Sequence, residues 1–129
     1  MALSPAFIST PRISVASVSS AVTDLTGATG VTTLITGAAT GTRVLEIDVQ
    51  CAATSAAALV NIFLSLDAGS SWTLFDQIAV TAATSSATVK ANRNLATYSN
   101  LILPDTNARL GCAVTVSQLT KVIALGGDF

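Results

Sequence analysis

The fold is decided by residues 61–80, which read Asn-Ile-Phe-Leu-Ser-Leu-Asp-Ala-Gly-Ser-Ser-Trp-Thr-Leu-Phe-Asp-Gln-Ile-Ala-Val. Apolar residues recur at every second position on both sides of a short polar segment, as they do in β-strands with one buried face. That segment, residues 67–71, contains residue types that favour tight turns. The stretch therefore predicts a β-hairpin. Its expected apolar faces consist of Val60, Ile62, Leu64 and Leu66 before the turn, and of Trp72, Leu74, Ile78 and Val80 after it.

The same alternation appears in other parts of the chain. It is clearest in residues 43–51, where Leu45, Ile47, Val49 and Cys51 are expected to face inward. Further strands are expected within 31–36, 95–103, 109–117 and 121–125, and residues 87–94 are expected to form a weak strand or an extended segment. No segment combines a helical apolar period with helix caps. We therefore predict an all-β protein, a single-domain antiparallel β-sandwich of jelly-roll-like type.

The ends of the chain differ from its middle. Residues 1–28 are rich in Ser, Thr, Ala and Val, contain Pro5 and Pro11, and alternate poorly. We predict that they form an extended N-terminal arm or an edge strand, and that residues 29–129 form the sandwich domain.

A glycine motif at residues 36–43, Thr-Gly-Ala-Ala-Thr-Gly-Thr-Arg, is similar to the phosphate-binding turn of nucleotide-binding folds. A helix must follow such a turn, whereas residues 43–51 alternate as a strand. In addition, Tyr98 is followed four residues later by Ile102 and not by a lysine. The motif therefore predicts an ordinary loop, and we expect no cofactor.

The composition is nearly neutral, with six basic and seven acidic residues, no His, and only 10% charged residues. This balance offers no electrostatic footprint for nucleic acid or for an anionic membrane. No apolar run approaches the ~18 residues of a transmembrane helix, and no signal peptide is evident. Cys51 and Cys112 are expected to be buried free thiols, with a disulfide as the alternative. Dispersed Ala and Val suggest apolar surface that is left for partners.

Catalytic and metal-binding patterns are scarce. Glu46 and Asp48 are the one pair of neighbouring carboxylates, and calcium binding or acid–base chemistry would need further oxygen ligands or a desolvated cleft. We expect them to be solvated or to pair with Arg or Lys of a neighbouring strand. Because the chain has no His and no Ser paired with a base, we predict no enzyme, no catalytic residue, no metal and no small-molecule substrate.

Several pieces of the sequence, in their order, resemble small phage and prophage virion proteins of the capsid decoration (cement) type. These pieces are the strand at 42–50, the hairpin at 60–80, the block Leu101-Ile-Leu-Pro-Asp-Thr-Asn-Ala-Arg-Leu110, and the ending Ile123-Ala-Leu-Gly-Gly-Asp-Phe129. The resemblance covers residues 30–129. The Gly-Gly-Asp-Phe ending is its most distinctive part.

The resemblance implies a jelly-roll-like sandwich that trimerises and stabilises an icosahedral head by binding its major capsid protein. The protein would be made in the host cytoplasm and would reside on the capsid surface of the virion. Candidate subunit or capsid contacts are Arg93, Arg109, Lys121, Asp128 and Phe129. The alternative function is a tail-fibre or spike domain that recognises a surface glycan, because Trp72 and Phe75 lie on opposite faces of one strand and one of them should be exposed.

Overall fold

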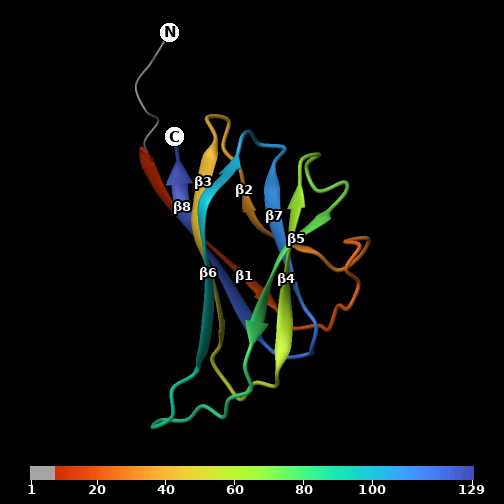
Figure 1. Ribbon diagram of the computed structural model, residues 1–129, viewed down its shortest axis with the longest axis vertical. Helices are drawn as coiled ribbons and strands as arrows, with labels where there is room; N and C mark the ends of the chain where they lie inside the picture. The colour runs from red at the N-terminus through yellow and green to blue at the C-terminus, as the bar shows by residue number, and fades with distance from the viewer. Residues whose placement is uncertain (1–7) are drawn as a thin grey trace.

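The computed structural model describes residues 8–129 and contains eight β-strands in two layers (Figure 1). The strands are β1 (Thr10–Val18), β2 (Thr32–Thr36), β3 (Thr42–Cys51), β4 (Ala58–Ser65), β5 (Thr73–Val80), β6 (Asn92–Leu103), β7 (Arg109–Val114) and β8 (Thr120–Asp128). They form a first sheet in the order β1-β8-β3-β6 and a second sheet in the order β2-β7-β4-β5. All named strand pairs are antiparallel, so the predicted all-β antiparallel sandwich is confirmed. Residues 8–129 contain no helix, hence none long and apolar enough to cross a membrane.

The predicted hairpin is the β4–β5 pair, and its turn is held by Asp67. The Asp67 carboxylate accepts hydrogen bonds from the side chain and backbone of Ser71 and from the Ser65 hydroxyl, and these bonds lower the pKa of Asp67 to about 2. Gly69 completes the turn with a φ of 87°. Leu66 was predicted to face inward, but it is 65% exposed, because β4 ends at Ser65 and Leu66 already belongs to the turn.

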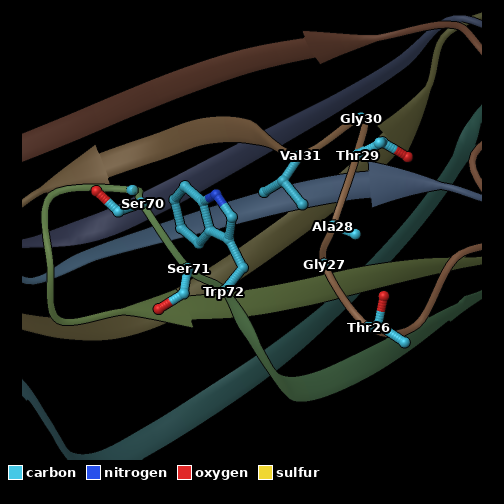
Figure 2. Close-up of a pocket in the computed structure, with 10 residues that line it drawn as sticks. Thr26, Gly27, Ala28, Thr29, Gly30, Val31, Ser70, Ser71 and Trp72 are labelled. Atoms are coloured by element: carbon cyan, nitrogen blue, oxygen red, sulfur yellow. The ribbon is translucent and has the colours of Figure 1, made fainter.

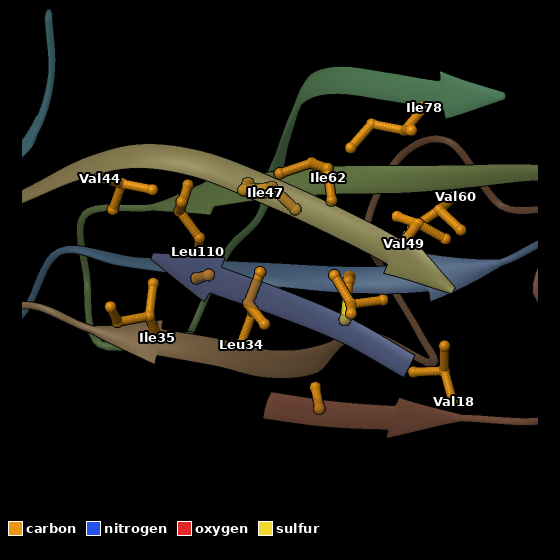
Figure 3. Close-up of a cluster of buried hydrophobic side chains, with 14 of the residues drawn as sticks. Val18, Leu34, Ile35, Val44, Ile47, Val49, Val60, Ile62, Ile78 and Leu110 are labelled. Carbon is orange, nitrogen blue, oxygen red and sulfur yellow. The ribbon is translucent and has the colours of Figure 1, made fainter. Parts of the chain in front are cut away.

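The core lies between the two sheets (Figure 3). Val44, Ile47 and Val49 of β3 oppose Val60 and Ile62 of β4 across it, and all five are fully buried. The sequence predicts this alternation because successive side chains of a strand point to opposite faces.

One inward assignment in β3 was wrong. A bulge between Val44 and Glu46 shifts the register against both β6 and β8. A bulge inserts one extra residue on its strand, so Leu45 points outward and is exposed, while Val44 takes the buried position.

The N-terminal segment joins the sandwich directly. β1 pairs with β8 along all nine of its residues, and its Ala16 and Val18 are buried in the core. Residues 10–18 therefore form an edge strand and not a separate arm, whereas residues 1–7 lie outside the described residues. The poor alternation has a physical cause, because β1 is apolar on both faces: Ile13 and Val15 point outward.

The glycine motif forms the loop between β2 and β3, as predicted. Gly41 adopts a φ of 94°, its N–H binds the Ala38 carbonyl at 3.0 Å, and strand β3 follows directly. The two cysteines are buried free thiols, also as predicted, and burial raises the pKa of Cys112 to about 12.

Candidate functional site

The outer face of the first sheet carries an aliphatic strip, which consists of Ile13, Val15, Ile123 and Leu125. These residues are cross-strand neighbours, because Ile13 pairs with Leu125 and Val15 pairs with Ile123 in the β1–β8 register. Ile13 is 69% exposed and Val15 is 61% exposed, while Ile123 and Leu125 are partly buried. Exposed apolar surface of this kind, gathered on one face of a sheet, is typical of a contact with a partner.

An ionic cluster lies beside the strip on β3 and β6. The Arg93 Nη2 atom lies 2.5 Å from Asp48 Oδ2 and 3.6 Å from Glu46 Oε1. The predicted pairing of these carboxylates with a basic residue of a neighbouring strand is therefore confirmed. Arg93 is about half exposed, whereas the Asp48 side chain is almost completely covered.

The two carboxylates of the cluster are electrostatically coupled. The hydrogen bond with Asp48 raises the pKa of Glu46, and burial and the negative charge of Asp48 add to this effect. Burial by itself would raise the pKa of Asp48, but its hydrogen bonds with Glu46 and Arg93 outweigh burial and lower it. Asp48 thus carries the negative charge that faces Arg93.

The predicted contact residue Lys121 lies on the same face as Arg93. Lys121 Nζ donates a hydrogen bond to Ser17 Oγ at 2.5 Å. In the register of the first sheet, Ser17 pairs with Lys121, Lys121 with Gln50, and Gln50 with Arg93. The fold thus places both basic residues in one row across this sheet, next to the aliphatic strip.

Arg109 is separated from this row, because it begins β7 in the second sheet. Its Nη2 donates to the Thr106 carbonyl at 3.2 Å, and its side chain lies against Gly69 of the hairpin turn. The structure therefore does not bring Arg109 together with Arg93 and Lys121.

The C-terminal residues Asp128 and Phe129 are engaged within the chain. Asp128 Oδ1 accepts a hydrogen bond from Thr42 Oγ1 at 2.7 Å and pairs with Arg12 Nη1 at 3.1 Å; the hydrogen bond from Thr42 and the nearby guanidinium lower the pKa of Asp128. Arg12 Nη1 also donates to the Thr36 carbonyl of β2 at 2.8 Å, so this group links the two sheets. The Phe129 N–H binds the Gly41 carbonyl at 3.0 Å, and the Phe129 ring packs on Gly41.

The glycines of this ending have a steric role as well. A Cβ on Gly126 would collide with the Arg43 backbone of β3, and a Cβ on Gly127 would collide with Ile8 and the Thr10 carbonyl. The Gly-Gly-Asp-Phe ending thus lets β8 lie closely between β1 and β3 and fixes one end of the sandwich.

An aromatic hollow lies on the side of the molecule where β5 meets β6. It has a volume of about 320 Å³ and is lined by Phe75, Thr97, Tyr98, Ser99, Asn100 and Leu101. The ring centroids of Phe75 and Tyr98 are 5.7 Å apart, and the Tyr98 hydroxyl donates to Asp76 Oδ2 at 2.8 Å. Burial, together with the hydrogen bond and charge of Asp76, raises the pKa of Tyr98. Phe75 is 40% exposed, so it is the exposed aromatic residue that the strand pattern predicted.

Trp72 occupies a different place, on the outer face of the second sheet. Its predicted position on the same face as Ile78 and Val80 was wrong, because the register between β4 and β5 shifts between Ile62 and Phe63. It lines a hollow of about 300 Å³ together with residues 26–31 and 69–71 (Figure 2). Its ring atoms lie about 3 Å from where a Cβ on Gly111 would be, and its own Cβ lies 2.6 Å from the corresponding position on Gly27. Trp72 therefore packs between the hairpin, β7 and the β1–β2 connection.

Sequence reasoning missed both the aliphatic strip and the aromatic hollow. The signal for the strip was present, because Ile13 and Val15 are spaced as one face of a strand. The aromatic hollow forms only where β5 and β6 come together, and alternation within single strands does not specify which strands are neighbours.

Within residues 8–129 no three His, Cys, Asp or Glu side chains converge as a metal site would require. No protein-family model, curated protein or solved structure matches this chain.

Proposed function

We propose that this protein is a structural component of a phage virion, a capsid decoration protein that binds and stabilises an icosahedral head as a homotrimer. The observation that carries the proposal is the aliphatic strip on the open face of the first sheet. A near-neutral chain that exposes such a surface is suited to permanent contact with other proteins.

Two further features support the proposal. The order of sequence pieces over residues 30–129 resembles that of decoration proteins. The strand orders β1-β8-β3-β6 and β2-β7-β4-β5 support the jelly-roll classification, an eight-stranded double sheet that recurs in capsid proteins. In this proposal the Gly-Gly-Asp-Phe ending stabilises the fold of the subunit, because Asp128 and Phe129 form hydrogen bonds with other residues of the same chain.

The proposed mechanism is multivalent binding to the major capsid protein on the virion surface. A trimer that touches a symmetric shell at three equivalent places gains affinity from linkage, so each contact can be weak. Binding to the assembled shell and not to free subunits stabilises the shell by mass action. The proposal includes no catalysis and no cofactor.

Imaging tests this function directly. The purified protein is mixed with undecorated capsids, assembled from the major capsid protein of the same phage genome, and examined by cryo-electron microscopy. We expect added density at threefold or quasi-threefold positions. Capsids that remain bare at saturating protein concentration would exclude the proposal.

The aromatic hollow favours one alternative, a tail-fibre or spike domain that binds a surface glycan. Sugar sites commonly combine exposed aromatic rings with polar side chains, and this hollow combines Phe75 and Tyr98 with Ser99 and Asn100. A glycan array probed with the isolated protein tests the alternative. Binding that is lost in a Phe75→Ala variant would favour it over decoration.

A further inference from the structure

We propose that β1 is the docking site for an extended segment of a partner protein, which adds to the free edge of the first sheet as a further strand. The inference rests on the proposed function, because the major capsid protein would carry the segment. It adds to that function which element of this chain binds the segment and which side chains the segment carries.

The edge strands of the two sheets differ in their regularity. They are β1 and β6 in the first sheet and β2 and β5 in the second. Leu34 in β2 and Phe75 in β5 have no register partner on the neighbouring strand, and residues 98–100 of β6 oppose Leu45 alone. Such bulges bend an edge strand and hinder the addition of another strand. β1 is the exception, because its nine residues pair one by one with β8 without a register shift.

The open part of this regular edge is residues 13–18, Ile-Ser-Val-Ala-Ser-Val. The start of β1 is protected, because Pro11 has no N–H and the charged Arg12 side chain reaches the Thr36 carbonyl of β2. Residues 13–18 contain no charge and no proline, and in residues 8–129 β1 pairs only with β8. Alternate residues of an antiparallel strand direct their N–H and C=O groups to opposite sides. Half of the backbone groups of residues 13–18 are therefore available to an added strand.

The surroundings of this edge define the chemistry of the segment. Ile13 and Val15 lie exposed on the outer face, so the outward side chains of an added strand would continue the aliphatic strip. At the other end of β1, Lys121 Nζ donates a hydrogen bond to Ser17 Oγ, and no carboxylate of the described residues pairs with Lys121. The segment therefore carries aliphatic or β-branched residues at alternate positions, and an acidic residue that faces Lys121.

The space beside the end of β1 is not filled by the chain itself. A hollow of about 230 Å³ lies there, and its lining includes Ser17 and Val18 of β1 and Thr32 of β2. A side chain near one end of the segment can enter this hollow.

A second copy of this chain fits the edge less well than such a segment. Two sandwiches that meet edge to edge along nine residues, about 30 Å, with sheets roughly 10 Å thick, would bury about 300 Å² on each copy. The total of roughly 600 Å² is typical of crystal packing and is too small for a specific interface. A segment that projects from a partner gains the main-chain hydrogen bonds of the edge and leaves the aliphatic strip to the body of that partner.

Hydrogen exchange of the free protein tests whether the edge is open. Within residues 13–18 we expect amides that exchange fast and slowly in turn, because every second N–H faces β8. Residues 121–125 of β8 have a neighbouring strand on each side; they are the control and should exchange slowly throughout. Uniformly slow exchange in residues 13–18 would show that the chain already covers this edge, and would overturn the inference.

Peptide binding tests the addition of a strand. The probes are overlapping peptides that cover the major capsid protein of the same phage genome, each long enough to span the nine residues of β1. We expect a peptide of the stated chemistry to slow the fast amides of residues 13–18. Val15→Lys should weaken its binding about tenfold, because a charge must then be brought against apolar side chains. The matched control is Leu95→Lys, at an exposed leucine on the opposite edge strand of the same sheet, which should bind like the wild type.

Circular dichroism confirms that both variants are folded. If no peptide protects the amides of residues 13–18, or if Val15→Lys and Leu95→Lys bind equally well, the inference is wrong.

A third variant, Lys121→Met, tests the acidic residue of the segment. It should weaken binding at low salt and have less effect at high salt, where the charge of Lys121 is screened. Unchanged binding at low salt would overturn this part of the inference.

The capsid experiment separates strand addition from decoration. If capsids remain bare although a capsid-protein peptide protects the amides of residues 13–18, decoration fails and strand addition stands. If the wild type and Val15→Lys decorate capsids equally well, and no peptide protects these amides, strand addition fails and decoration stands.

Discussion

The two sheets differ in the exposure of their outer faces: the first is open to solvent and the second is covered by other parts of the chain. On the first sheet, the outward residues Ile13 and Val15 lie open to solvent. On the second sheet, Phe63 of β4 and Ala113 of β7 are completely buried, although neither belongs to the core between the sheets. One sandwich thus has a covered outer face and an open one.

The cover of the second sheet is made by the β1–β2 connection, residues 19–31, together with Trp72. The connection bonds to β7, where the Val22 N–H donates to the Val114 carbonyl at 2.8 Å. At Gly111, a Cβ would collide with Val31 and would lie 2.9 Å from the Trp72 ring. Figure 1 shows this connection on the side of the second sheet away from the first. The chain therefore covers one apolar face with its own segment and leaves the other open to solvent.

The largest expected effect contrasts Phe63 with Ile13. Phe63→Ala removes a completely buried ring and should lower the free energy of unfolding by about 3–5 kcal/mol. Ile13→Ala, on the open face, should change it by less than about 0.5 kcal/mol. Urea unfolding at a fixed, low chain concentration, where subunit association contributes little, measures both. Equal losses for the two variants would show that the faces do not differ.

The next effect concerns the cover itself. Trp72→Ala removes a half-buried ring from between β7 and the connection, and should cost about 2–3 kcal/mol, less than a fully buried aromatic residue. Amide hydrogen exchange should become faster in residues 26–31. The matched control is Phe75→Ala, an exposed aromatic residue of the same hairpin, which should leave exchange in residues 26–31 unchanged. Unchanged exchange in Trp72→Ala would mean that the connection is held by other contacts.

The strands were predictable because their signal is local. Alternation in residues 43–51 and 60–80 identified β3, β4 and β5, and placed Asn61, Phe63 and Ser65 on the face opposite Val60 and Ile62. It did not predict that these three outward residues are buried, because their cover comes from elsewhere in the chain.

The errors arose where local periodicity is interrupted or where partners are distant. The bulge at Leu45 reverses one residue, and the end of β4 exposes Leu66. For residues 10–18 the choice between an arm and an edge strand was left open, because both faces of β1 carry apolar residues and the alternation is poor. A basic partner was expected for Glu46 and Asp48, but its identity as Arg93 depends on the β3–β6 register, which alternation alone does not specify.

A smaller effect is expected where Arg12, paired with Asp128, connects the first sheet to the second. Asp128→Ala leaves Arg12 and Thr42 without their shared acceptor and should lower the free energy of unfolding by about 1–2 kcal/mol at pH 7. Because the folded pKa of Asp128 lies below its ordinary value of 3.8, the wild-type advantage is complete above that value and disappears as the pH falls through the folded pKa. Thermal unfolding of the wild type and of Asp128→Ala from pH 7 to pH 2 measures this difference in stability. A difference that stays constant with pH would show that the ionised Asp128 carboxylate is not its cause.

The smallest effect is expected from Arg93→Met on the open face. Arg93 is about half exposed, so solvent screens its pairing with Asp48, and the free energy of unfolding should hardly change. Loss of the guanidinium charge should raise the pKa of both Asp48 and Glu46, since Arg93 lowers each of them in the wild type. Carbonyl-carbon NMR titration measures these pKa values, with Asp67 of the hairpin turn as the internal reference that should not move. A loss of several kcal/mol would instead mean that the pair behaves as a buried one, and that this face of the first sheet is less open than Ile13 and Val15 indicate.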